Sequence, residues 1–205
     1  MKKFYLYNRN MVLALLFTLF LSFVVSSCQQ ELKDTNINIE KSINNVSLIT
    51  EQEVFEIQKS WGDGIVQIGK VYLEKGDYKT VASEHIRKFY NYENGKVLFK
   101  PTLVSEKQFR NDFEGALSYF VAGDKNYPED HGFAIKPWSA VRWENIGTTI
   151  KGEVALAMGN YYFRPAKGGD VVKVEYSFAY IKDKDGKLKI ILHDSHIPYK
   201  PVEKH

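Results

Sequence analysis

The stretch Leu188–Tyr199, LKIILHDSHIPY, decides how the rest of the chain must be arranged. Apolar residues alternate through its first half, which is the pattern of a β-strand with one buried face. The strand then ends in adjacent polar groups before a proline stops it: His193, Asp194, Ser195 and His196. An apolar strand that finishes in acid, base and hydroxyl groups predicts the floor of a pocket, whose walls the rest of the chain supplies.

Alternation divides these polar groups between the two faces of the strand. His193 and Ser195 share one face, and Asp194 and His196 share the other with Leu188, Ile190 and Leu192. Because the apolar side of a sheet turns toward its helices and cavity, the alternation favours Asp194 and His196 as the inward pair. The opposite register, with His193 and Ser195 inward, stays open from the residues alone.

Upstream of this strand, further alternating stretches are separated by turn residues. They predict strands over 97–102, 133–145, 150–162 and 172–180. Gly147 and Gly152 are expected in turns, and Asp185-Gly186 leads into the last strand. Pro101 limits the first of these strands to an edge or an end, because proline donates no ladder hydrogen bond.

The first half of the domain carries helical patterns instead. Apolar residues recur three or four positions apart over 54–72, which predicts a helix with one apolar face, and Thr50 with Glu53 forms a capping box at its start. Further helices are expected over 78–90 and 113–121. Helices followed by a run of strands predict a single α+β domain, 49–200, with helices on one face of a strongly bent antiparallel sheet.

The N-terminal region has the organisation of a bacterial export signal. Residues 1–27 combine a basic start with an apolar run too short for a convincing membrane span, and small residues follow it. The sequence VSSC, which ends at Cys28, resembles the lipobox of bacterial lipoproteins. We therefore expect a signal peptide over 1–27, a lipid on Cys28, a polar tether over 28–48, and a protein anchored to a membrane of the bacterial cell envelope.

Charge and cysteine content exclude several classes of function. The formal net charge is +3, and the signal carries Lys2, Lys3 and Arg9 without an acid, so the mature chain is about neutral. A neutral domain gives no support for nucleic-acid binding. The chain's one cysteine is Cys28, so we expect no disulfide and no thiolate metal site.

Several blocks of the domain resemble a known family in the same order. They are LFKPTLVSEKQFR, FEGALSYFVAG, GFAIKPWSAVRWENIG, ALAMGNYYF and LHDSHIPY. Together they are similar to a bacterial and algal family of the NTF2-like fold that includes the metal-independent, iota-class carbonic anhydrases. The resemblance implies a cone-shaped cavity, conversion of CO2 and water to bicarbonate and a proton, and no metal or other cofactor.

The resemblance also implies candidate catalytic residues. The family's threonine falls on Thr102 in KPTL, its tyrosine on Tyr119 in ALSYF, and its HHSS pattern on residues 193–196. The first histidine and serine are kept as His193 and Ser195, whereas the second members are replaced by Asp194 and His196. In either register, hydroxyl donors and a histidine base could hydrate CO2.

Two other functions remain open at this point. One is a non-catalytic module that binds a small anion or apolar ligand in the same cone. The other is an isomerase or dehydratase that uses Asp194 and His196 as a proton-transfer pair. A zinc site is disfavoured because His193 and His196 lie on opposite faces of the strand. We also expect a homodimer formed through the outer face of the sheet.

Overall fold

The computed structural model describes residues 48–201, which belong to one compact unit. The predicted signal peptide, Cys28 and nearly all of the tether lie outside the described residues. The elements are α2 (Glu51–Leu73), α3 (Tyr78–Phe89), β1 (Leu98–Lys100), α4 (Phe113–Val121), the 3-10 helix η1 (Phe133–Ile135), β2 (Trp138–Lys151), β3 (Val154–Pro165), β4 (Val172–Lys182) and β5 (Leu188–His196). Among residues 48–201, none of the helices could span a membrane.

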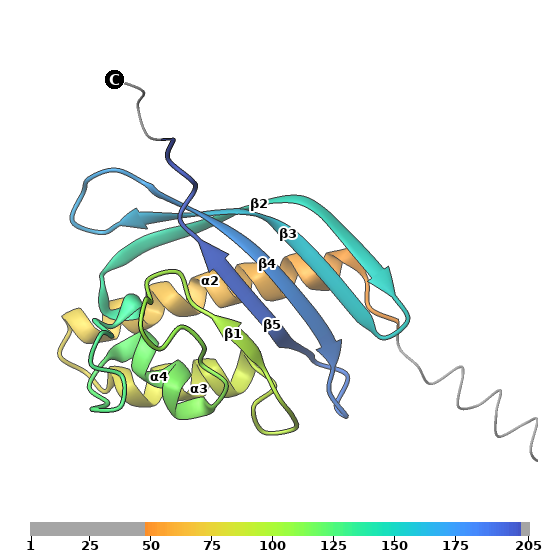
Figure 1. Ribbon diagram of the computed structural model, residues 1–205, viewed down its shortest axis with the longest axis horizontal. Helices are drawn as coiled ribbons and strands as arrows, with labels where there is room; N and C mark the ends of the chain where they lie inside the picture. The colour runs from red at the N-terminus through yellow and green to blue at the C-terminus, as the bar shows by residue number, and fades with distance from the viewer. Residues whose placement is uncertain (1–47, 202–205) are drawn as a thin grey trace, which may run out of the picture. The chain divides into compact units, whose positions relative to one another are not determined.

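The strands form one sheet in the order β1-β5-β4-β3-β2 (Figure 1). Neighbours from β2 to β5 are antiparallel, but β1 pairs with β5 in parallel, so the sheet is mixed and not purely antiparallel as predicted. The parallel pairing sets Phe99 beside His193. The last strand therefore lies between β1 and β4, with ladder partners on both sides of its polar end.

The long helix α2 begins at the predicted capping box. Thr50 Oγ1 accepts from the backbone N–H of Glu53, and the Glu53 carboxylate accepts from the backbone N–H of Thr50. The helix packs against β2 so closely that a methyl group on Gly62 would lie 2.9 Å from Cβ of Val141. Glycine within a helix costs about 1 kcal/mol relative to alanine, and here close approach to the sheet offsets that cost.

Two local predictions about β2 are wrong. Gly147 does not form a turn; it lies inside β2, where the pairing passes from Asn145 with Gly159 to Gly147 with Met158. Ile146 is left over as a bulge residue, which bends the strand. The strand also begins at Trp138 instead of residue 133, because Phe133–Ile135 form η1. The predicted turn at Gly152 is confirmed and has a left-handed φ of 58°.

Candidate active site

A β-bulge in β5 determines which polar groups face the core. Tyr180 pairs with Ile190 and Ala179 with Leu192, so Ile191 has no counterpart on β4. An extra residue reverses the phase of the alternation along a strand. Ile190 is therefore buried before the bulge, and His193 and Ser195 are buried after it. The inward orientation of Asp194 and His196, favoured by strict alternation, is wrong.

His193 is held on all sides by aromatic side chains and is only 3% exposed. Its ring stacks between Phe99 and Phe178, with ring centroids 4.5 and 4.1 Å away. Tyr90 Oη lies 2.8 Å from His193 Nδ1, and Tyr161 Oη lies 3.2 Å from Nε2. Burial, with a smaller contribution from Lys100, lowers the pKa of His193 well below its ordinary value, so the imidazole is neutral at neutral pH.

Hydroxyl groups continue from His193 toward the loop after β1. Ser195 Oγ lies 3.5 Å from His193 Nε2, and Thr102 Oγ1 donates to Ser195 Oγ at 2.9 Å. The Tyr119 hydroxyl is buried and forms no hydrogen bond within 48–201. Burial raises the pKa of Tyr119 well above its ordinary value, although Leu103 and Thr102 lie near enough to oppose part of that rise. Tyr119 is therefore a protonated donor with free capacity.

The structure thus brings His193, Ser195 and Thr102 together, with Tyr119 oriented toward the same region. Tyr161 belongs to this group and was missed, since its sequence context predicts only core or dimer surface. The pKa of Tyr161 is raised by burial, and the nearby hydroxyl groups of Ser195 and Thr102 oppose the rise. Alternation with the buried Phe163 on β3 was the one available indication that Tyr161 faces inward.

A small pocket of about 30 Å³ reaches Tyr119 from the loop side. Its lining residues are Leu103, Tyr119, Glu129, His131, Gly132, Phe133 and Lys136. A cavity of this size has room for one or two water molecules. His131 is exposed and lines this pocket.

Asp194 and His196 lie on the opposite face of β5. Their side chains are hydrogen-bonded, with His196 Nε2 2.9 Å from Asp194 Oδ2, and are 39% and 52% exposed, respectively. They line a surface groove of about 460 Å³ with Leu98 and Phe109. Among residues 48–201, no cluster of three or more His, Cys, Asp or Glu side chains could hold a metal ion.

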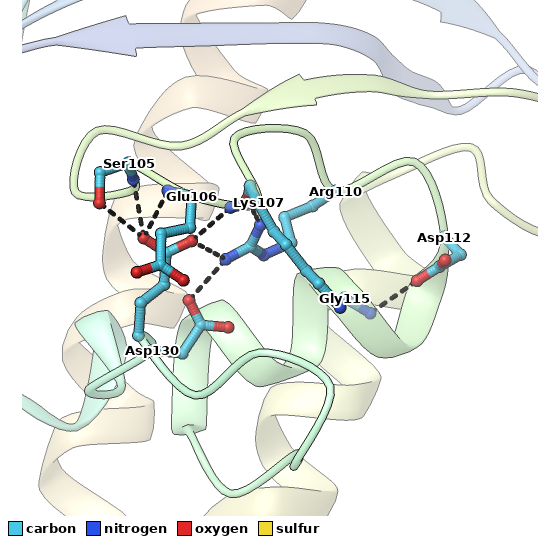
Figure 2. Close-up of polar contacts among 8 residues, drawn as sticks. Ser105, Glu106, Lys107, Arg110, Asp112, Gly115 and Asp130 are labelled. Atoms are coloured by element: carbon cyan, nitrogen blue, oxygen red, sulfur yellow. Dashed lines mark hydrogen bonds and ion pairs between the residues drawn. The ribbon is translucent and has the colours of Figure 1, made fainter.

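A partly buried network of ionic contacts and hydrogen bonds holds the loop after β1 (Figure 2). Arg110 Nη2 pairs with Asp130 Oδ1 at 2.7 Å, and both side chains are fully buried. The Glu129 carboxylate accepts from the backbone N–H groups of Ser105, at 2.7 Å, and Lys107, at 2.8 Å. The loop after β1 is thereby joined to the loop that follows α4, so Thr102 and Tyr119 are held in one arrangement.

The Glu129 contacts predict a specific acid sensitivity. Hydrogen bonds from backbone N–H groups lower the pKa of Glu129 from 4.5 to about 2. The N–H of Ser105 contributes most, and those of Glu106 and Lys107 add to it. A carboxylate whose pKa is lower in the folded state stabilises the protein at any pH above its pKa in the unfolded state. This contribution is lost as pH falls from about 4.5 toward 2. Glu129→Gln should therefore flatten the pH dependence of unfolding free energy across that range, measured by urea denaturation.

A matched control for this test is Glu84→Gln, which changes an exposed glutamate of α3. It should leave the slope of stability against pH unchanged between 4.5 and 2. An unaltered slope in Glu129→Gln would show that the carboxylate does not hold the loop.

A family model described as metal-independent carbonic anhydrase matches residues 52–197. The chain belongs to this family. A "Metal-independent carbonic anhydrase" from Nostoc sp. (strain PCC 7120) is 44% identical over 154 residues, which are 74% of this chain and 75% of that protein. The predicted membership in the metal-independent carbonic anhydrases is confirmed.

A solved structure agrees with this family assignment. A cyanobacterial iota-carbonic anhydrase crystallised with bicarbonate matches with a TM-score of 0.72 and 41% identity, covering 75% of this chain and 95% of that chain. An NTF2-like protein of unknown function from Shewanella oneidensis MR-1 matches with a TM-score of 0.38 and 16% identity, covering 65% of this chain and 97% of that chain. The predicted α+β fold is confirmed for this member of the metal-independent carbonic anhydrase family.

Proposed function

We propose that this chain catalyses the reversible hydration of CO2 to bicarbonate without a metal, at the site formed by Thr102, Tyr119, His193 and Ser195. The observation that carries the proposal is the buried chain of polar contacts from His193 through Ser195 to Thr102, in a member of this family. CO2 and bicarbonate are the small ligands that the pocket would take.

The negative charge that develops in the reaction lies near the hydroxyl donors of the site. The oxygen of water forms the new bond to the carbon of CO2, and one C=O electron pair moves onto its oxygen. The attacking water loses one proton to the solvent, which leaves bicarbonate. Hydroxyl groups held in a buried site stabilise the oxygen that gains negative charge. The raised pKa values of Tyr119 and Tyr161 keep both hydroxyls protonated and able to donate.

Non-catalytic anion binding is the second candidate, because the same hydroxyl donors would also hold bicarbonate. It predicts bicarbonate binding without turnover. The proton-transfer pair of Asp194 and His196 is a weaker basis for another enzyme activity, because both side chains lie on the outer face of β5, away from Thr102 and Tyr119.

Stopped-flow CO2 hydration with Ser195→Ala tests the proposal. Removing this hydroxyl deletes one donor and the partner of Thr102, so kcat should fall about 100-fold, as for other oxyanion donors. Ser177→Ala is the matched control. Ser177 on β4 pairs with Asp194 on β5 and has its side chain on the outer face, so turnover should be unchanged. Equal rates in the two variants would contradict the proposed site.

We propose further that Cys28 carries a lipid that anchors the domain to a membrane of the bacterial envelope, because VSSC resembles a lipobox. Radioactive palmitate should label the wild-type chain and fail to label Cys28→Ser. An unlabelled wild-type protein that partitions into the aqueous phase of a detergent extract would contradict the anchor.

We also propose a homodimer through the outer face of the sheet. Leu156 and Met158 are exposed on β3, where they alternate with the buried Ala155 and Ala157. Apolar side chains on a sheet face are stabilised when a second copy covers them. Sedimentation analysis should show a dimer that Met158→Glu dissociates, and a monomeric wild-type domain would contradict the proposal.

A further inference from the structure

We infer that Trp61 and Tyr90 fix His193 in the tautomer with its proton on Nε2, so that His193 acts as a hydrogen-bond donor to the pocket hydroxyls. Tyr90 and Trp61 are positioning residues, and their effect on turnover rests on the proposed function. The direction of each hydrogen bond in the buried chain does not depend on the reaction.

The direction of the chain is set at Trp61 on α2. An indole nitrogen can only donate, and Trp61 Nε1 lies 3.2 Å from Tyr90 Oη. Both side chains are buried, at 2% and 1% exposed. The Tyr90 oxygen therefore accepts one hydrogen bond from the indole.

The hydroxyl proton of Tyr90 then needs an acceptor. His193 Nδ1, 2.8 Å away, is the only other hydrogen-bond partner of Tyr90 Oη within 48–201. If Nδ1 also carried a proton, the oxygen would accept twice and its hydroxyl proton would be buried without an acceptor. An unsatisfied buried polar group costs about 1–3 kcal/mol. Tyr90 therefore donates to Nδ1, and Nδ1 is the unprotonated nitrogen.

A neutral imidazole with a bare Nδ1 carries its proton on Nε2. Nε2 lies 3.2 Å from Tyr161 Oη and 3.5 Å from Ser195 Oγ. Phe99 and Phe178 stack on the two faces of the ring and oppose its rotation. Tyr161 Oη accepts from Nε2, and Ser195 Oγ accepts from Thr102, so the protons of both hydroxyl groups are left to point at a substrate oxygen.

The consequence for the site is a change in the role of His193. The nitrogen that faces Ser195 and Tyr161 has no lone pair to accept a proton from the attacking water. His193 instead orients hydroxyl protons toward the oxygen that becomes negative, which is the arrangement that lowers the barrier for an anionic product. The aromatic pair Trp61 and Tyr90 would thus act on the reaction without contacting the substrate.

Imidazole ¹⁵N NMR of the full chain, without substrate, tests the tautomer directly. In the wild type, the resonance of His193, identified by its loss in His193→Gln, should show a pyridine-type Nδ1 and a pyrrole-type Nε2. Tyr90→Phe removes the donor to Nδ1, so the two nitrogens should shift toward the opposite tautomer or an average. Tyr92→Phe, whose hydroxyl bonds the carbonyl of Arg110, is the matched control and should leave both resonances in place.

Turnover then tests the positioning role. Tyr90→Phe should lower kcat for CO2 hydration about 10- to 100-fold with little change in KM, as with other groups that orient a ligand through a second hydrogen bond. Trp61→Phe should cause a smaller loss of the same kind. A pyrrole-type Nδ1 in the wild type would overturn the relay even in an active enzyme. A correct tautomer with unchanged kcat in Tyr90→Phe would overturn its role in turnover. An inactive wild type with the expected tautomer would count against the proposed function alone.

Discussion

Replacing Arg110 with methionine is expected to lower the free energy of unfolding by about 3–5 kcal/mol, because breaking a buried ion pair leaves an uncompensated charge. The Arg110 side chain is 0% exposed, pairs with the buried Asp130, and stacks over the ring of Tyr127 with its guanidinium carbon 4.4 Å from the ring centroid. Its backbone N–H also donates to the carbonyl of Phe99, at 2.8 Å, beside the strand that holds His193. The change should appear as a lower midpoint in urea denaturation.

Lys59→Met is the control for this prediction. Lys59 and Asp63 form an i,i+4 pair on α2 with side chains 67% and 66% exposed. An exposed pair of this kind contributes about 0.3–0.5 kcal/mol. A loss in Arg110→Met no larger than that in Lys59→Met would show that the buried network does not stabilise the domain.

Replacing His193 with glutamine is expected to reduce kcat/KM for CO2 hydration by about 100- to 10,000-fold, the range over which a positioned proton-transfer or donor group acts. Glutamine retains an amide donor but loses the ring that stacks between Phe99 and Phe178 and its contact with Tyr90. Initial rates should be measured by stopped flow, with circular dichroism to confirm that the variant is folded.

His196→Gln provides the paired measurement on the same strand. His196 is exposed, and its contact with Asp194 is on the outer face, so its replacement should change kcat/KM by less than about twofold. Equal losses in His193→Gln and His196→Gln would mean that β5 uses both faces in the reaction, against the register found here.

Local patterns were sufficient to predict most of the elements. The capping box of Thr50 and Glu53, the apolar spacing of α2 and the turn at Gly152 depend on residues close together in the chain, and all three are present. The bulge at Ile191 was not predictable in this way, because it is defined by the pairing of β5 with β4. Because Ile191 is an extra residue on β5, His193 and Ser195 face inward and Asp194 and His196 face outward.

The candidate site was predictable only in part for a related reason. Thr102, Tyr119, His193 and Ser195 followed from the family resemblance. Tyr90 and Tyr161 did not, because their contacts with His193 join residues 103 and 32 positions apart in the chain. Nothing in the local sequence of either tyrosine distinguishes it from a core aromatic residue. The pairing of Arg110 with Asp130 was likewise not predictable, because Asp130 lies in a loop with several other charged residues.

The most direct test of the central claim is stopped-flow CO2 hydration by the wild-type chain after chelation, with residual metal measured by elemental analysis. Turnover by a hydroxyl and imidazole pocket should be the same before and after metal removal and should not rise when zinc is added back. Activity that disappears with the metal and returns with added zinc would contradict the account.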